Sequence, residues 1–185
     1  MSPASPAAHE HLALEAELSD GPVRFARERL RLPMGLEASF GWLRHPPTVL
    51  VVPRCADGRL LLLRRYHPAV GRWVLEFPSG VLMAEESPEV GAARLVGSLT
   101  GLGCGAWRQL GVLRPNPGYS DEVIHLFLAR GLTRLEQPPA GDEDEDLEVL
   151  LMEPAELDAA IASGDEALDG KSVTAWFRAR QRLLA

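Results

Sequence analysis

The pattern of apolar and polar residues changes at Val23 and predicts two β-strands near the start of the chain. "VRFARERLRL" (23–32) and "LEASFGWLR" (36–44) are separated by a proline–methionine–glycine sequence at 33–35 that marks a turn. We therefore expect these two segments to form an antiparallel pair. Residues 1–18 are rich in Ala, Pro and Glu and are expected to form a flexible or weakly helical tail.

Longer apolar runs predict strands that are buried on both faces. "TVLVVPR" (48–54), a turn at 57–58 and "RLLLLRRY" (59–66) are expected to form a hairpin. "RWVLEF" (72–77) is expected to be a short strand, which Pro78 ends. Further strand-like segments lie at 106–115, 121–132 and 147–152.

Helical signals occupy three other segments. "PAELDAAIASG" begins with Pro154 in the first turn and stops at Gly164. A helix is expected between Ser87, which can cap its first turn, and Gly101. "KSVTAWFRARQRLL" carries one apolar stripe of an amphipathic helix. Together with the strands, these helices predict an α/β fold of the layered α+β kind with a mixed sheet.

Composition and charge narrow the classes of partner. The chain has 185 residues, of which 46% are apolar, and its net charge is −7. An acidic surface repels phosphate backbones, so we expect no nucleic-acid partner, whereas a small phosphorylated ligand fits a locally basic cleft. The chain shows no signal-peptide pattern and no apolar run of membrane-spanning length, so we expect a cytoplasmic protein without a membrane partner. Cys55 and Cys104 show no metal spacing and are expected to be inert thiols.

The most specific motif of the chain is "GVLMAEESPEVGAARLVGSLTGLG" (80–103). It resembles the Nudix hydrolase box, G-x5-E-x7-R-E-U-x-E-E-x-G-U, in which U is bulky and apolar. The matching residues stand in the correct register: Gly80, Glu86, Arg94, Val96, Gly101 and Leu102. Outside the box, "RRYHPAVGRWVLEFPSG", "RPNPGYSDE" and "ALDGKSVTAWF" resemble segments of the ADP-ribose pyrophosphatase branch of this family.

The resemblance implies an organisation and a set of partners. It implies a Nudix-type α/β/α sandwich over residues 46–185 and an N-terminal antiparallel β segment over residues 19–45. Because the N-terminal strands of this branch exchange between subunits, it also implies a homodimer. The ligand that it implies is a nucleotide sugar, and the cofactor of the branch is Mg²⁺.

Three positions that hold the metal in the family carry no carboxylate in this chain. In the Nudix helix these glutamates have the spacing i, i+3 and i+4, which places their oxygens on one helix face. Here the positions are Leu95, Ser98 and Leu99. Since Mg²⁺ requires oxygen ligands, we assign no metal ligand and expect Mg²⁺ only if other acids hold it.

The resemblance assigns catalytic roles to Glu86 and Arg94 of the box, and to Glu145. Glu145 aligns with the catalytic base of the branch and lies in the acidic run "GDEDED" (141–146). Such a run is also typical of a solvated loop, so both interpretations stay open.

Four residues are expected to bind the substrate. Arg64 and Arg65 resemble the basic pair of the family, because guanidinium groups form bidentate hydrogen bonds with a diphosphate. Both arginines would equally suit the solvent-facing end of a strand. Glu76 resembles a residue that borders the nucleotide pocket. Glu122 resembles a glutamate that lines the site, and a surface position is its alternative.

Two hypotheses follow from different classes. The first is a Mg²⁺-dependent hydrolase of ADP-ribose or a related nucleoside diphosphate sugar, with Glu145 as base and other acids holding the metal. The second is a Nudix fold that binds such a ligand with little or no hydrolysis. We favour the second, because metal activation supplies much of the rate in phosphoanhydride hydrolysis and leucine cannot ligate a cation.

Overall fold

The computed structural model describes residues 8–140, 147–164 and 167–183, and the chain divides into two compact units. Unit 1 comprises Met1–Pro46 and Arg114–Val123, and unit 2 comprises Pro47–Leu113 and Ile124–Ala185. The predicted division into an N-terminal β segment over residues 19–45 and a Nudix domain over residues 46–185 stays a prediction.

Unit 1 contains the sheet β1-β2-β3, formed by β1 (Glu10–Asp20), β2 (Val23–Arg31) and β3 (Glu37–Arg44). The expected antiparallel pairing of the second and third strands is confirmed, with Phe25 opposite Leu43.

The flexible tail predicted for residues 1–18 is wrong over 10–18, which belong to β1. This segment pairs with β2 along its backbone, and Arg31 donates a 2.7 Å hydrogen bond from Nη1 to Oε2 of Glu10. Partner-strand hydrogen bonds and cross-strand ion pairs stabilise a strand that local composition does not signal. Residues 1–7 lie outside the described part of the chain.

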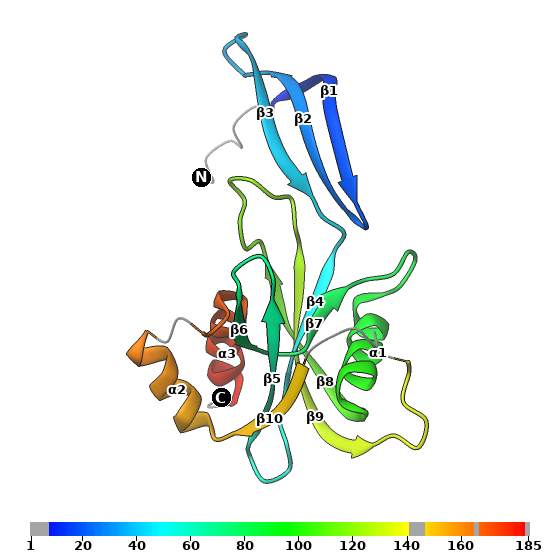
Figure 1. Cartoon of the computed structure of the whole chain (residues 1–185), viewed down its shortest axis with the longest axis vertical. Coiled ribbons are helices and arrows are strands. Elements are labelled where there is room, and N and C mark those ends of the chain that lie inside the picture. Colours follow the sequence, from blue (N-terminus) through cyan, green and yellow to red (C-terminus); the bar gives the residue numbers. More distant parts are fainter. Residues whose placement is uncertain (1–7, 141–146, 165–166, 184–185) are drawn as a thin grey trace, which may run out of the picture. The chain divides into compact units, whose positions relative to one another are not determined.

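The strands of unit 2 form two sheets (Figure 1). The first has the order β7-β4-β9-β8, and its strands are β7 (Ser79–Val81), β4 (Thr48–Pro53), β9 (Ile124–Arg134) and β8 (Leu102–Leu113). The second has the order β10-β5-β6, and its strands are β10 (Leu147–Met152), β5 (Leu60–His67) and β6 (Arg72–Glu76). Because β4 and β9 are parallel while the other neighbours are antiparallel, the first sheet is mixed, as predicted.

The hairpin predicted from β4 and β5 is wrong, although both strands exist. β4 pairs with β7 and β9, β5 pairs with β10 and β6, and a single bridge joins Arg54 to Leu60. All six residues of β4 are buried, as the apolar run predicted. A strand that is buried on both faces needs a partner on each edge and a covering layer on each side, so nearness in sequence does not select its partners.

Three helices cover the sheets at the predicted positions: α1 (Pro88–Thr100), α2 (Pro154–Ser163) and α3 (Gly170–Leu183). Neighbouring residues of β4 point to opposite faces of the first sheet. Leu50 packs in one core cluster with Trp176 of α3, whereas Val49 packs in a second cluster with Val96 of α1. The sheet therefore lies between helices on both sides, which confirms the Nudix-type α/β/α fold class (Figure 1). None of the helices that the structure describes has the length and apolar character needed to span a membrane.

Candidate functional site

Helix α1 has the ends that the sequence predicts. The Ser87 side chain accepts a 3.3 Å hydrogen bond from the Val90 backbone N–H, and Pro88 occupies the first turn. Gly101 ends the helix in a left-handed conformation with φ of 70°, and its N–H donates to the carbonyl of Gly97. Glycine adopts this conformation without the steric cost of a β-carbon. The caps fix where α1 begins and ends.

Glu86 and Arg94 form a bidentate ion pair that ties the loop before α1 to the helix. Arg94 donates from Nε to Glu86 Oε1 over 2.8 Å and from Nη2 to Glu86 Oε2 over 2.7 Å. Arg94 also donates to the carbonyl of Val81, and the Met83 N–H donates to Glu86. The hydrogen bonds from Arg94 lower the pKa of Glu86 below its ordinary value, so Glu86 is ionised at neutral pH.

The helix face that follows Arg94 packs as part of the apolar core. Leu95 is buried and shares a cluster with Val49 and Val96, and Leu99 packs against the same cluster. Ser98 donates from its hydroxyl to the carbonyl of Leu95 over 3.3 Å, so it bonds within its own helix. These contacts leave only one side-chain oxygen on this face.

Of the two other predicted acids, one belongs to unit 1 and one lies outside the described residues. Glu145 belongs to the segment 141–146, which lies outside the described residues. Glu122 is in unit 1, where its Oε1 lies 4.0 Å from Nδ1 of His45. Across residues 8–140, 147–164 and 167–183, no three His, Cys, Asp or Glu side chains gather into a metal-binding group.

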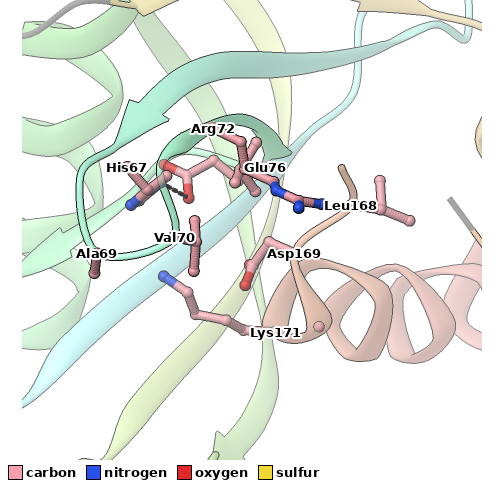
Figure 2. A pocket seen from close by; sticks show the side chains of 10 residues that line it. His67, Ala69, Val70, Arg72, Glu76, Leu168, Asp169 and Lys171 are labelled. Atoms are coloured by element: carbon pink, nitrogen blue, oxygen red, sulfur yellow. Dashed lines mark hydrogen bonds and ion pairs between the residues drawn. The ribbon is translucent and has the colours of Figure 1, made fainter. Parts of the chain in front are cut away.

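Unit 2 contains a cavity of about 670 Å³ between the β5–β6 loop and the start of α3 (Figure 2). Its lining mixes ionisable and apolar side chains, and the ionisable ones are His67, Arg72, Glu76, Asp169 and Lys171. A concave site of this size with few converging polar groups is typical of a small-molecule pocket.

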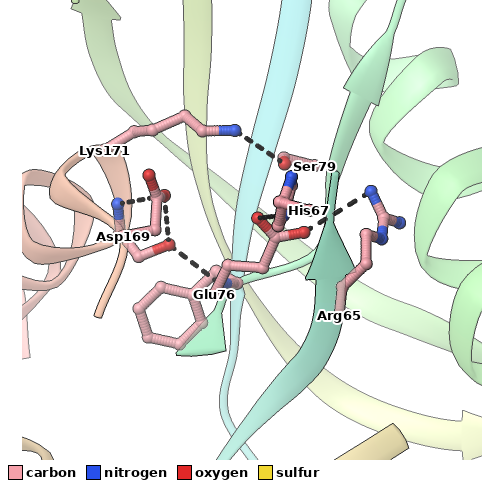
Figure 3. Close-up of polar contacts among 8 residues, drawn as sticks. Arg65, His67, Glu76, Ser79, Asp169 and Lys171 are labelled. Atoms are coloured by element: carbon pink, nitrogen blue, oxygen red, sulfur yellow. Dashed lines mark hydrogen bonds and ion pairs between the residues drawn. The ribbon is translucent and has the colours of Figure 1, made fainter. Parts of the chain in front are cut away.

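Glu76 is the buried acid of this pocket, with 1% of its surface exposed. Its Oε2 lies 3.1 Å from Nε2 of His67, and its Oε1 lies 3.4 Å from Nη1 of Arg65 (Figure 3). A buried carboxylate is stable only when cations or donors surround it. Glu76 and Arg65, both predicted as binding residues, are therefore brought together.

Hydrogen bonds connect the start of α3 to Phe77, the residue after Glu76. The Phe77 N–H donates to Ser172 Oγ over 2.9 Å, and Ser172 Oγ donates to Asp169 Oδ2 over 2.9 Å. Next to this chain of bonds, Lys171 Nζ donates to Ser79 Oγ over 3.4 Å (Figure 3). The turn from Asp169 to Ser172 therefore positions Lys171 beside Ser79, the first residue of β7.

The two predicted arginines have different neighbours in the structure. Because neighbouring residues of a strand point to opposite faces, Arg64 and Arg65 diverge on β5. The guanidinium of Arg64 lies 2.7 Å from Glu148 and 5.9 Å from the ring centroid of Trp73. Of this pair, only Arg65 contacts a residue that lines the pocket.

His67, Arg72, Asp169 and Lys171 were not predicted as site residues from the sequence. One signal was available for Lys171, because it is the only lysine in a chain with 19 lysine and arginine residues. No signal along the sequence brings residue 171 to residue 79, which lies 92 positions away.

The family of the chain is evident from a match over most of its length. The NUDIX domain model matches residues 44–177, which is more than half of the chain. A solved structure described as "Crystal structure of ADP compounds hydrolase" superposes with a TM-score of 0.83 at 22% identity. The superposition covers 97% of this chain and 96% of the solved chain. At 22% identity, this similarity shows the fold.

Curated relatives agree with this match. The chain is 31% identical over 139 residues to the ADP-ribose pyrophosphatase of Bacillus subtilis (strain 168), covering 75% of each protein. It is 31% identical over 144 residues to the ADP-ribose pyrophosphatase of Mycobacterium tuberculosis, covering 76% of this chain and 70% of that protein. It is 30% identical over 128 residues to the methanol dehydrogenase activator of Bacillus methanolicus, covering 69% of each. The chain therefore belongs to the NUDIX domain family, in the branch that contains the ADP-ribose pyrophosphatases.

Proposed function

We propose that this protein binds a nucleoside-diphosphate-sugar-like ligand and hydrolyses it little or not at all. The observation that carries the proposal is the apolar packing of Leu95 and Leu99 on the face of α1. A carboxylate at either position would have to face the sheet or displace these contacts.

The residues on this helix face do not fit a magnesium site. Mg²⁺ requires near-octahedral oxygen coordination and binds proteins through carboxylates. At positions 95, 98 and 99 the chain offers two hydrocarbon side chains and one hydroxyl that bonds to its own helix. Without a cation to neutralise the phosphate oxygens and activate water, phosphoanhydride hydrolysis loses most of its acceleration.

The ligand class is supported by the relatives and by the pocket. Two relatives at 31% identity are named ADP-ribose pyrophosphatases, and the superposed structure is described as an ADP compounds hydrolase. The pocket of unit 2 places Arg72 and Lys171 beside Glu76 and Asp169. Such a mixture suits a ligand with both phosphate and hydroxyl groups.

The second candidate is an active Mg²⁺-dependent pyrophosphatase that uses acids elsewhere in the chain, with Glu145 as base. The names of the two pyrophosphatase relatives favour it. It requires a metal site that includes residues other than Leu95, Ser98 and Leu99.

One experiment separates the two candidates. The protein and the variant Leu95→Glu/Ser98→Glu/Leu99→Glu are incubated with ADP-ribose and Mg²⁺, and AMP and ribose 5-phosphate are quantified. We expect no turnover by the unmutated protein at rates typical of enzymes, about 1 s⁻¹ or more. Turnover at such a rate, abolished by EDTA, would replace the proposal with the second candidate. Calorimetric titration with ADP-ribose in EDTA tests the binding part separately.

We also propose that the protein is a homodimer formed through unit 1. Several large apolar side chains of this unit are exposed: Leu14, Leu18, Phe25 and Phe40. Light scattering coupled to size-exclusion chromatography tests this state, and a monomer mass at micromolar concentration would contradict it.

A further inference from the structure

We propose that the pocket of unit 2 holds the sugar-phosphate end of the ligand with protein cations and without a divalent metal. In this arrangement Lys171 and Arg72 bind the phosphate, and Glu76 accepts hydrogen bonds from sugar hydroxyls. The inference rests on the proposed function, because it specifies how the same kind of ligand is recognised.

Lys171 has the position and the partner expected of a phosphate ligand. It lines the cavity from the first turn of α3, whose Ser172 N–H is capped by the carboxylate of Asp169. Its polar partner among the described residues is the neutral hydroxyl of Ser79, at 3.4 Å. When a phosphate enters, Lys171 can replace its long hydrogen bond to the Ser79 hydroxyl with a charge-assisted hydrogen bond to a phosphate oxygen.

Glu76 gives an independent indication of a ligand. It is 1% exposed and lines the same cavity, yet its Oε1 accepts no hydrogen bond from the residues that the structure describes. The ion-pair contact from Arg65 Nη1 lies at 3.4 Å. Because a buried acceptor without a donor costs free energy, a ligand hydroxyl directed at this carboxylate is favourable.

The pocket lining is less acidic than the chain as a whole. Arg72 and Lys171 carry two positive charges, and Glu76 and Asp169 carry two negative charges, so the sum is 2 − 2 = 0 with His67 neutral. The whole chain has a net charge of −7. Low-dielectric walls strengthen the attraction between the two cationic side chains and an anion.

Cationic side chains can bind a phosphate group without promoting its hydrolysis. Fixed ammonium and guanidinium groups neutralise phosphate oxygens as a metal does, but they do not convert bound water into hydroxide at neutral pH. A pocket built in this way retains its ligand without cleaving it.

The single lysine permits a direct test. Reductive methylation with ¹³C-formaldehyde labels the Lys171 amine and the α-amine at the N-terminus while keeping their charges, and the two signals are distinguished with the variant Lys171→Arg. ADP-ribose, ribose 5-phosphate and inorganic phosphate are then added in EDTA. We expect ADP-ribose and ribose 5-phosphate to shift the Lys171 signal, with inorganic phosphate binding more weakly because it offers no sugar hydroxyls to Glu76.

Calorimetry on matched variants measures the contribution of each charge. Lys171→Met is expected to weaken ADP-ribose binding in EDTA by about ten-fold or more, and Lys171→Arg by about three-fold or less. The control Arg59→Met removes an arginine that pairs with Asp57 in the β4–β5 turn and is expected to leave the affinity unchanged. Glu76→Gln is expected to reduce the preference for ribose 5-phosphate over inorganic phosphate.

The outcomes distinguish this inference from the proposed function. Binding that appears only when Mg²⁺ is present, or equal affinities for Lys171→Met and Arg59→Met, would overturn the inference alone. Hydrolysis of ADP-ribose in Mg²⁺ would overturn the proposed function and leave the binding measured in EDTA intact. No binding of ADP-ribose to the folded protein would overturn both.

Discussion

Leu95 lies directly over Gly80, so that a β-carbon on residue 80 would come within 2.6 Å of Leu95 Cδ2. The first glycine of the Nudix box and the first residue after its arginine are thus joined by close apolar packing. Leu95 is 8% exposed, which leaves little room for a solvated group at this position. The contact stabilises this helix face by apolar packing.

Gly80→Ala is expected to destabilise the protein by about 1–3 kcal/mol, because its methyl group overlaps the Leu95 side chain. The free energy of unfolding in urea measures the effect. In the double variant Gly80→Ala/Leu95→Ala the cost should be smaller than the sum of the two single costs. Gly118→Ala is the control, since no atom lies within 4 Å of its added β-carbon. Additive costs in the double variant would contradict the contact.

Leu95→Glu is expected to lower the free energy of unfolding by about 3 kcal/mol or more in the absence of metal, because it places a carboxylate in an apolar cluster. Thermal unfolding with and without Mg²⁺ gives a second measurement. Mg²⁺ should leave the melting temperature of the unmutated protein unchanged. It should raise that of Leu95→Glu/Ser98→Glu/Leu99→Glu if the three carboxylates create a site. Stabilisation of the unmutated protein by Mg²⁺ would point to a metal site elsewhere.

The Glu86–Arg94 pair is expected to make stability depend on pH in the acid range. The pKa of Glu86 is lowered in the folded protein, mainly by hydrogen bonds from Arg94, from an ordinary value of 4.5. The stabilisation, about 1 kcal/mol for this partly exposed pair, is therefore complete above pH 4.5 and is lost as the pH falls through the lower folded value.

The free energy of unfolding in urea is measured between pH 3 and pH 7 for the unmutated protein and for Glu86→Gln. The difference in stability should be largest at neutral pH and should shrink towards acid pH. The exposed acid replaced in Glu136→Gln provides the matched control. A difference that stays constant over the whole range would contradict ionisation of Glu86 as its cause.

Ser172→Ala is expected to cost about 1–3 kcal/mol, because it leaves the buried Phe77 N–H without an acceptor. The same change should weaken ADP-ribose binding, since Ser172 holds the turn that carries Lys171. Ser163→Ala removes a hydroxyl whose bond to the Ala160 carbonyl is exposed, and it should change stability by less than about 0.5 kcal/mol. Equal costs for the two serine variants would argue against the role of the Phe77 bond.

Cys104 is expected to react slowly with thiol reagents. Burial raises its pKa from 9.0 to about 11, so its thiolate fraction at pH 8 is lower by about 100-fold. The reaction of the Cys55→Ser protein with Ellman's reagent measures Cys104 alone, in buffer and in urea. Its rate should rise steeply on unfolding, and fast labelling of the native protein would contradict the burial.

Elements of this protein that depend on neighbours within one turn are predicted well from the sequence. Ser87 and Gly101 bound α1, and Pro154 and Gly164 bound α2, because caps act on backbone groups only a few residues away. The spacing of the Nudix box also identified Glu86 and Arg94, which form an ion pair between the loop before α1 and the helix. Predictions failed where partners are distant, as for β1 over residues 10–18 and for the β4–β5 hairpin.

The residue order was sufficient to predict the three helices, their caps, most strands from Val23 onward and the apolar character of positions 95 and 99. The three-dimensional packing was needed to learn that Arg65, and not Arg64, contacts Glu76, and that Lys171 reaches the Ser79 hydroxyl. Periodicity and capping arise from local backbone geometry, which the residue order encodes directly. A pocket arises where separate layers pack, so the residues that line it are chosen by long-range contacts rather than by their positions along the chain.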